Sequence, residues 1–300
     1  MKLIRKDTTN IHRYLLILLV GVVFFSLLLV FEQPYTTQAQ AYRKPKNFDE
    51  AIELLIKAEG KIQKRYVDDA VEMMWKFSTS TGNTEREKAF VKLAARLDGL
   101  PKVHRNRLKA VMGEINIEVA MVKAGRIPRG RRLKHVGSAD RGRSIYHHGF
   151  DAFLETTRKE RGLRKKIYHV VESKSTEDTG RLTVGRLPKK IGNSRQMSEE
   201  WINKNYDDML KAAENIIKEN VQPKETIAKA WETKNAINAL RRKKLAKQEK
   251  TLIITRVKGI ADNVAKGDSL SVGLRKEMKK QGFHIIEIDP SGVVLNVYAP

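Results

Sequence analysis

The hydrophobic and polar pattern sets the first 41 residues apart from the rest of the chain. Residues 1–13 carry four Lys or Arg, and residues 14–31 then run without a charged side chain. A polar stretch follows and ends in Ala39, Gln40 and Ala41. A basic start, an apolar core and a small-x-small end are the parts of a secretory signal peptide, but an apolar run of this length also suffices for a membrane anchor. Residues 1–41 are predicted to be either one, and in both cases the body is exported, to the periplasm, the medium or the outer side of the inner membrane.

Residues 42–102 show the spacing of helices. Asn47 precedes Glu50 by three positions, which is typical of a helix N-cap, and apolar residues then recur at helical intervals. Thr84 and Glu87 repeat the cap pattern before a second apolar stripe. We therefore expect an N-terminal helical region, with no reactive side chains grouped in it.

Helices and strands alternate in the remainder, residues 103–300, which is expected to form one α/β domain. A third helix is predicted over residues 103–124, ending before Gly125. In the C-terminal third the pattern predicts helices near residues 198–219 and 223–248, a strand at 251–257, a capped helix, and a hairpin over 283–298. The predicted fold class is α/β with a mixed sheet.

A predicted hairpin at the centre of this domain gathers the candidate chemistry. Two strand-like segments flank the polar turn RKERG, and the second ends in Glu172, Ser173 and Lys174. Strand side chains alternate between faces, so Glu172 and Lys174 point the same way. A turn centred near residue 161 places Asp151 opposite about Val171, within a residue or two of Glu172. Two carboxylates and a lysine are thus expected at one end of the hairpin.

Composition and charge narrow the partners. The chain has 300 residues, 41% of them hydrophobic, which is ample for a folded core, and a formal net charge of +24. Such an excess of basic residues points to a polyanion or an anionic membrane surface as partner. The absence of cysteine excludes disulfides, thiolate metal sites and a cysteine nucleophile.

Two carboxylates opposite each other in a sheet need a compensating cation. Lys174 can neutralise one of them, and a divalent metal held by Asp151 and Glu172 would neutralise the other, since hard cations such as Mg²⁺ prefer carboxylate oxygens. A metal-activated water would then be a nucleophile for a phosphate. The alternative is a solvent-exposed Glu–Lys salt bridge at a strand end, with no chemical role.

Four motifs in order resemble the PD-(D/E)xK phosphodiesterase superfamily, with its restriction-endonuclease-like fold, and in particular the nuclease domains of bacterial polymorphic toxins. The motifs are MGEINIEVAMVKAG, HHGFD, VVESK and GNSRQMSEEWI, and they cover about residues 103–220. The resemblance implies a helix bearing a glutamate, a strand bearing an aspartate, a strand bearing E-x-K, and a following helix that contributes a Gln. Phe150 stands where the motif has proline, and no tyrosine follows Gln196 by four residues, which argues against the exonuclease subgroup.

The resemblance also implies roles for five residues. Asp151 and Glu172 would bind Mg²⁺ or Mn²⁺, Lys174 would orient or deprotonate the attacking water, and Gln196 would position the water or a phosphate oxygen. Glu114 would support the metal shell, although Glu118, one helical turn later, could take that place.

These observations predict an exported, Mg²⁺-dependent endonuclease, and the resemblance implies a toxin effector paired with an immunity protein. DNA is the favoured substrate, and RNA stays open. The alternative is a non-catalytic basic protein, tethered to the membrane, that binds nucleic acid or an anionic cell-envelope polymer. That alternative accounts for the charge and the apolar N-terminus but gives Asp151, Glu172 and Lys174 no shared role.

Overall fold

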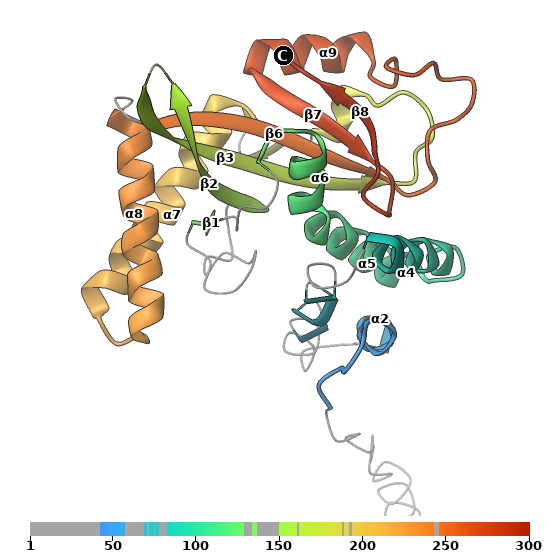
Figure 1. Ribbon diagram of the computed structural model, residues 1–300, viewed down its shortest axis with the longest axis horizontal. Coiled ribbons are helices and arrows are strands. Elements are labelled where there is room, and N and C mark those ends of the chain that lie inside the picture. The colour runs from blue at the N-terminus through green and yellow to red at the C-terminus, as the bar shows by residue number, and fades with distance from the viewer. Residues whose placement is uncertain are drawn as a thin grey trace, which may run out of the picture. The chain divides into compact units, whose positions relative to one another are not determined.

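A mixed β-sheet forms the centre of the fold in the computed structural model (Figure 1). In the described part of the chain its strand order is β1-β2-β3-β6-β7-β8, and β3, β6 and β7 run parallel while the other neighbours pair antiparallel. The strands are β1 (Lys134–His135), β2 (Ala152–Glu160), β3 (Leu163–Thr176), β6 (Ala246–Arg256), β7 (Phe283–Ile288) and β8 (Val294–Tyr298). The predicted α/β class with a mixed sheet is confirmed.

The structure describes part of the chain. The described residues are 43–57, 69–70, 72–74, 76–77, 83–128, 134–136, 150–160, 162–187, 189–191, 194–242 and 246–300. The predicted signal peptide or anchor, residues 1–41, lies outside them, as does most of the basic segment between residues 126 and 143. No helix within the described ranges has the length and apolarity to cross a membrane.

Helices precede the sheet and connect its strands. They are α2 (Phe48–Lys57), α4 (Asn83–Arg96), α5 (Lys102–Ile115), α6 (Ile117–Lys123), α7 (Glu199–Glu219), α8 (Lys224–Arg242) and α9 (Val272–Gln281); a short 3₁₀ turn (Val184–Arg186) and a small ladder of β4 (Lys189–Ile191) and β5 (Ser194–Arg195) lie between β3 and α7. The N-cap predicted for the first helix is confirmed, because Asn47 Oδ1 accepts the Glu50 N–H at 2.8 Å.

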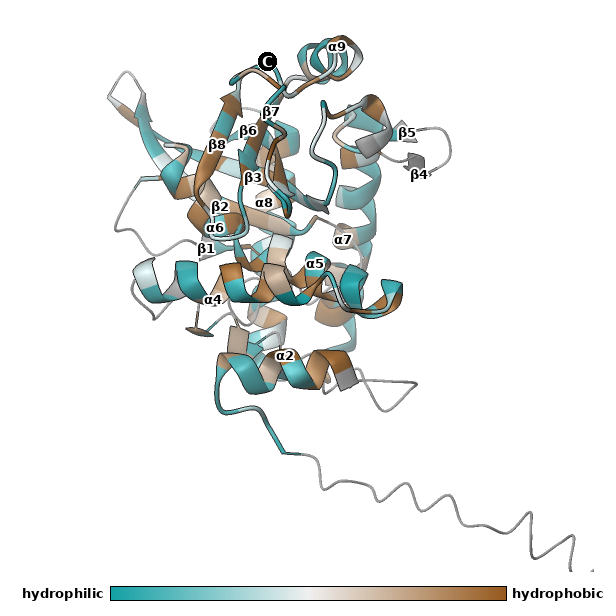
Figure 2. Ribbon diagram, turned by 90° about the vertical axis from the view of Figure 1, so that its right-hand side faces the viewer, coloured by the Kyte–Doolittle hydropathy of each residue, from teal (hydrophilic) through white to brown (hydrophobic). Residues whose placement is uncertain are grey.

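Both faces of the sheet are buried against helices. On one face Tyr168, Val170, Leu252 and other strand residues pack against α7, α8 and α9. On the other face Val171, Ile253 and their neighbours pack against α6. Burial on both faces explains why residues 167–172 of β3 are all buried, rather than every second one. Figure 2 shows this hydrophobic band running through the central strands.

A separate core holds the N-terminal helices together. Buried residues of α2 and α4 pack with Leu108, Val111, Met112 and Ile115 of α5. Helix α5 also packs directly on β3, so it joins this helical core to the sheet. The N-terminal helical core therefore includes α5, most of which lies beyond the predicted helical region, residues 42–102.

Three helix boundaries differ from the prediction. Helix α4 begins at Asn83, so Thr84, the predicted N-cap, lies within the helix. The helix expected over residues 103–124 breaks at Asn116, which is fully buried and donates its side-chain amide to the Pro290 carbonyl at 3.0 Å. The break lets Ile115 pack in the helical core and Ile117 pack against the sheet. The helix expected over residues 223–248 ends at Arg242, and residues 246–250 belong to β6, because pairing along β3 overrides their helical propensity.

Candidate active site

The carboxyl-terminal half of β3 carries a buried glutamate and a lysine on one face. Glu172 is 2% exposed and Lys174 is 26% exposed, and Lys174 Nζ donates to Glu172 Oε1 at 2.6 Å. Both side chains point to the α7 side of the sheet, as Val170 does. The expectation that the pair shares a face is confirmed. A solvent-exposed salt bridge does not describe it, because the carboxylate is almost completely buried.

Gln196 reaches the same carboxylate from another part of the chain. Its Nε2 donates to Glu172 Oε1 at 2.5 Å, and the side chain is fully buried. The residue lies in the turn before α7, two positions ahead of the N-cap Ser198, and not on the helix as the resemblance implied. The next residue, Met197, has a φ of 69°, a left-handed conformation that costs a non-glycine residue about 1–3 kcal/mol. This strained turn aims Gln196 at Glu172.

Asp151 stands at the start of β2, beside Glu172 across the hairpin. Ala152 pairs with Val171, so the register brings Asp151 level with Glu172, as predicted. Asp151 Oδ2 accepts the backbone N–H of Ser173 at 2.7 Å, which ties the carboxylate to the strand that carries Glu172 and Lys174.

Helix α5 packs on the opposite face of β3 at the level of the site. Gly113 makes the closest approach: a Cβ there would lie 2.8 Å from Ser173 Oγ and 2.9 Å from Ser175 Oγ. Ser175 Oγ in turn donates to the Lys109 carbonyl at 2.6 Å. Glu114 follows Gly113 and is half-buried at this contact. Sequence reasoning missed the serines, although the small residues S-x-S after the E of E-x-K are a sequence signal for close helix approach.

Glu118 belongs to a different local environment. The break at Asn116 places it on α6, and its Oε1 lies 2.5 Å from Nε2 of His135 on β1. The expectation that Glu114 and Glu118 share one face of a continuous helix is wrong, because α5 and α6 are separate helices.

The oxygen atoms at the site suit a hard divalent cation, but few side chains supply them. Asp151 and Glu172 offer carboxylate oxygens, which Mg²⁺ and Mn²⁺ prefer. The Oε1 atom of Gln196 is buried without a hydrogen-bond partner, so it could accept from a water or ligand at the site. Within the described ranges, no three His, Cys, Asp or Glu side chains gather closely enough to hold a metal ion. Glu114 is therefore not brought into one group with Asp151 and Glu172.

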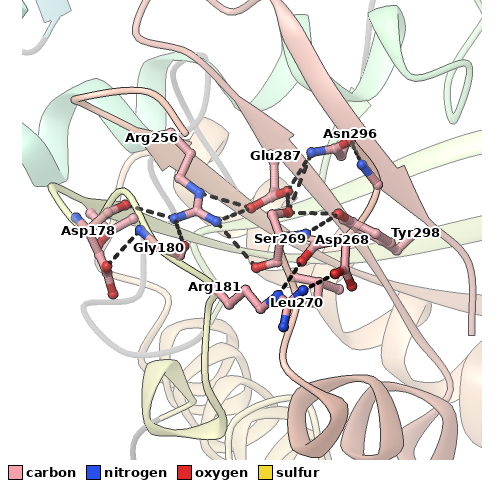
Figure 3. A network of polar contacts seen from close by, with 12 residues as sticks. Asp178, Gly180, Arg181, Arg256, Asp268, Ser269, Leu270, Glu287, Asn296 and Tyr298 are labelled. Atoms are coloured by element: carbon pink, nitrogen blue, oxygen red, sulfur yellow. Dashed lines mark hydrogen bonds and ion pairs between the residues drawn. The ribbon is translucent and has the colours of Figure 1, made fainter. Parts of the chain in front are cut away.

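A second buried ion pair fixes the chain just beyond the site (Figure 3). Arg256 and Glu287 are both fully buried, with Arg256 Nε donating to Glu287 Oε1 at 2.9 Å. Arg256 Nη1 also donates to the carbonyls of Asp178 (2.7 Å) and Gly180 (2.8 Å), in the segment that follows β3. Because Arg256 pairs with Thr176 in the sheet, this network holds the end of β3 two residues beyond Lys174.

Comparison with known proteins adds no relative. No family model, curated protein or solved structure matches the chain. The site is therefore interpreted from its own residues and geometry.

Proposed function

We propose that the chain is an exported, metal-dependent nuclease that hydrolyses phosphodiester bonds of DNA, on a fold of the restriction-endonuclease-like type. The observation that carries the proposal is the meeting of Glu172, Lys174 and Gln196 around one buried carboxylate oxygen, with Asp151 level with them across the hairpin. These are four of the five residues that the sequence motifs single out.

The order of elements supports the same interpretation. A helix with Glu114, a strand preceded by Asp151, a strand with E-x-K and a helix preceded by Gln196 follow one another along the chain. Glu172 and Gln196 come from separate segments, 24 positions apart in the sequence, yet their side chains meet.

Physical cost argues against a purely structural ion pair. Burying a carboxylate and an ammonium costs desolvation that their attraction often fails to recover, and apolar residues of similar volume commonly serve stability as well. Here the pair is accompanied by a strained turn at Met197 and a buried Gln196 oxygen without a partner. Costly features that cluster at one place are typical of a functional site.

Each residue has a role that its position permits. Asp151 and Glu172 would hold the divalent ion, which, when bound, supplies charge neutralisation and lowers the pKa of a bound water. Lys174, a quarter exposed, would orient the attacking water and hold or release its proton at Nζ. Gln196 would fix the Glu172 carboxylate through Nε2 and accept a hydrogen bond at Oε1.

The direct test is metal-dependent cleavage of a labelled DNA duplex. The full chain, purified in detergent because of its apolar N-terminus, should cleave DNA in Mg²⁺ or Mn²⁺ and stop when EDTA is added. Asp151→Asn should be inactive with the metal present, whereas Asp208→Asn, which changes an exposed carboxylate on α7, should behave as the wild type. Cleavage that persists undiminished in EDTA would refute the metal-dependent mechanism.

The N-terminal pattern supports export, and the toxin-like resemblance supports a role as an effector with an immunity protein. Metal-independent DNA binding without any cleavage would instead favour the non-catalytic basic protein. A cell-envelope polymer as ligand would be favoured if such binding were stronger for that polymer than for DNA.

A further inference from the structure

The free end of the β2–β3 hairpin projects beyond the other strands of the sheet. β3 begins to pair with β6 at Lys166, and β1 pairs with β2 only at Leu154 and Glu155. Residues 157–160 and 163–165 therefore form a two-stranded ribbon that no third described strand flanks (Figure 1). Figure 2 shows this end of the hairpin as hydrophilic.

Like charges lie directly opposite each other in the ribbon. Arg158 pairs with Lys165, and Lys159 pairs with Arg164. Cross-strand neighbours of like charge destabilise a sheet, so this arrangement works against the hairpin in isolation. Arg158, Lys159 and Arg164 are also exposed, which leaves them accessible to an anionic partner.

The alternation of side chains places basic residues on both faces of the ribbon. Arg158 and Lys165 point to one face, and Lys159 and Arg164 point to the other, where Arg164 also borders a pocket beside Glu232 of α8. A flat anionic surface, such as a membrane, could contact one face only. A partner with phosphates on both sides of a groove contacts both, and the major groove of B-form DNA is wide enough to admit a two-stranded ribbon.

Further basic residues continue one face toward the sheet. Arg126, Lys247 and Arg158 lie 2.6, 3.6 and 3.8 Å from oxygens of Glu249. Burial lowers the pKa of the adjacent His169 to about 4, so that imidazole is neutral near pH 7. Three cations thus share one carboxylate, and this face keeps a net positive charge beside the ribbon.

The ribbon and the candidate active site lie on the same strand. Lys165 and Glu172 are seven positions apart on β3, which is about 23 Å at roughly 3.3 Å per residue. One duplex, with a major groove about 12 Å wide, is large enough to contact both.

We propose that the β2–β3 ribbon inserts into the major groove of double-stranded DNA and so holds the duplex for the site at Glu172 and Lys174. The second half of this statement rests on the proposed nuclease function; the first half does not. Duplex RNA is disfavoured, because its major groove is deep and too narrow for side chains to read.

The test compares two variants that lose the same charge. The ribbon variant carries the substitutions Arg158→Gln, Lys159→Gln, Arg164→Gln and Lys165→Gln. The control variant carries Lys266→Gln, Lys276→Gln, Lys279→Gln and Lys280→Gln, at exposed positions on and before α9. Binding to duplex DNA is measured over a range of salt concentrations, in EDTA so that no cleavage occurs, and thermal unfolding confirms that each variant is folded.

The ribbon variant should bind duplex DNA at least about tenfold more weakly, and its salt slope should fall by about 2 to 4, since each phosphate contact contributes about 0.9. The control variant should keep most of the wild-type affinity and slope. Without DNA, the ribbon variant should be at least as stable as the wild type, because the like-charge repulsion is removed. Duplex RNA of the same sequence should bind the wild type more weakly than DNA.

Three results would overturn the proposal. Unchanged DNA binding by the ribbon variant is one, and equal losses in ribbon and control variants are another, since they would mean a general charge effect. The third is a loss of binding to phosphatidylglycerol vesicles with DNA binding intact, which would make the ribbon a membrane contact.

The nuclease function and the ribbon can fail separately. A wild-type chain that binds DNA through the ribbon but does not cleave it supports the ribbon and refutes the nuclease. A ribbon variant that binds and cleaves DNA like the wild type refutes the ribbon and leaves the nuclease standing.

Discussion

Two buried glutamates on the same face of the sheet are neutralised in different ways. Glu287 meets Arg256, and its second oxygen accepts hydrogen bonds from Ser269 and Asn296. Arg256, Glu287, Ser269 and Asn296 are all buried, and Figure 3 shows the contacts among them. Glu172 meets Lys174, which is partly exposed, and Gln196, which keeps one buried oxygen without a partner.

The difference separates a structural ion pair from a candidate reactive one. An arginine that also donates to three backbone carbonyls is fixed in place and cannot give up its proton. A lysine with access to solvent can turn its N–H donors toward a water or a ligand. A buried carboxylate alone therefore does not identify a candidate active site. The solvent exposure and the unused hydrogen-bonding atoms of its partners do.

The largest effect on stability is expected at the ion pair of Arg256 and Glu287. Arg256→Met leaves Glu287 buried without its cation, which should lower the free energy of unfolding by about 3–5 kcal/mol. Arg181→Met, which removes an exposed arginine paired with Asp268 in the same region, should cost less than about 1 kcal/mol. Urea unfolding measures the free energy of unfolding of both variants. Equal small losses would mean that the Arg256–Glu287 network does not stabilise the fold.

Gln196 should matter for catalysis more than for folding. Gln196→Ala removes a hydrogen bond to a charged group, worth about 1.5–3 kcal/mol, and should slow single-turnover DNA cleavage by about 10- to 100-fold. Gln248→Ala is the matched control, because Gln248 accepts a bond from Tyr206 away from Glu172. Wild-type cleavage by Gln196→Ala would remove this residue from the site.

The packing of α5 on β3 should be sensitive to one methyl group. Gly113→Ala would press a Cβ against Ser173 and Ser175, at a cost of about 1–3 kcal/mol. At Gly99 nothing lies within 4 Å of an added Cβ, so Gly99→Ala should be close to neutral. Thermal unfolding compares the two, and a neutral Gly113→Ala would show that α5 is not held against β3 at this point.

The smallest effect is expected from the helix glutamates. Glu114→Gln should reduce cleavage a few-fold more than Glu118→Gln, because Glu114 adjoins the contact with β3 while Glu118 is engaged by His135. Single-turnover rates at saturating enzyme decide the order. The reverse order would assign the supporting carboxylate to α6.

The sequence allowed the hairpin to be predicted because its signals are local. Alternation and the turn RKERG predicted the register to within one residue, and with it the position of Asp151 level with Glu172. The break at Asn116 was missed because it depends on a distant partner, the Pro290 carbonyl. The extent of α8 was overestimated because residues 246–250 have a helical composition but gain more from pairing with β3.

The site was predictable in its members but not in its surroundings. Motif order singled out Glu172, Lys174 and Gln196, whereas the left-handed Met197 carries no sequence signal, since glycine or asparagine is expected there. The Arg256 network was missed for a similar reason: its arginine and glutamate are 31 residues apart on strands that only the fold makes neighbours.

The central claim is that Lys174 acts in catalysis and does not merely balance a buried charge. The measurement is single-turnover cleavage of duplex DNA by Lys174→Ala, together with DNA affinity at one fixed salt concentration and Lys204→Ala on α7 as the control. We predict a rate lower by about two to four orders of magnitude with DNA affinity unchanged. Cleavage at the wild-type rate by a folded Lys174→Ala variant would contradict the account and return Glu172 and Lys174 to a structural ion pair.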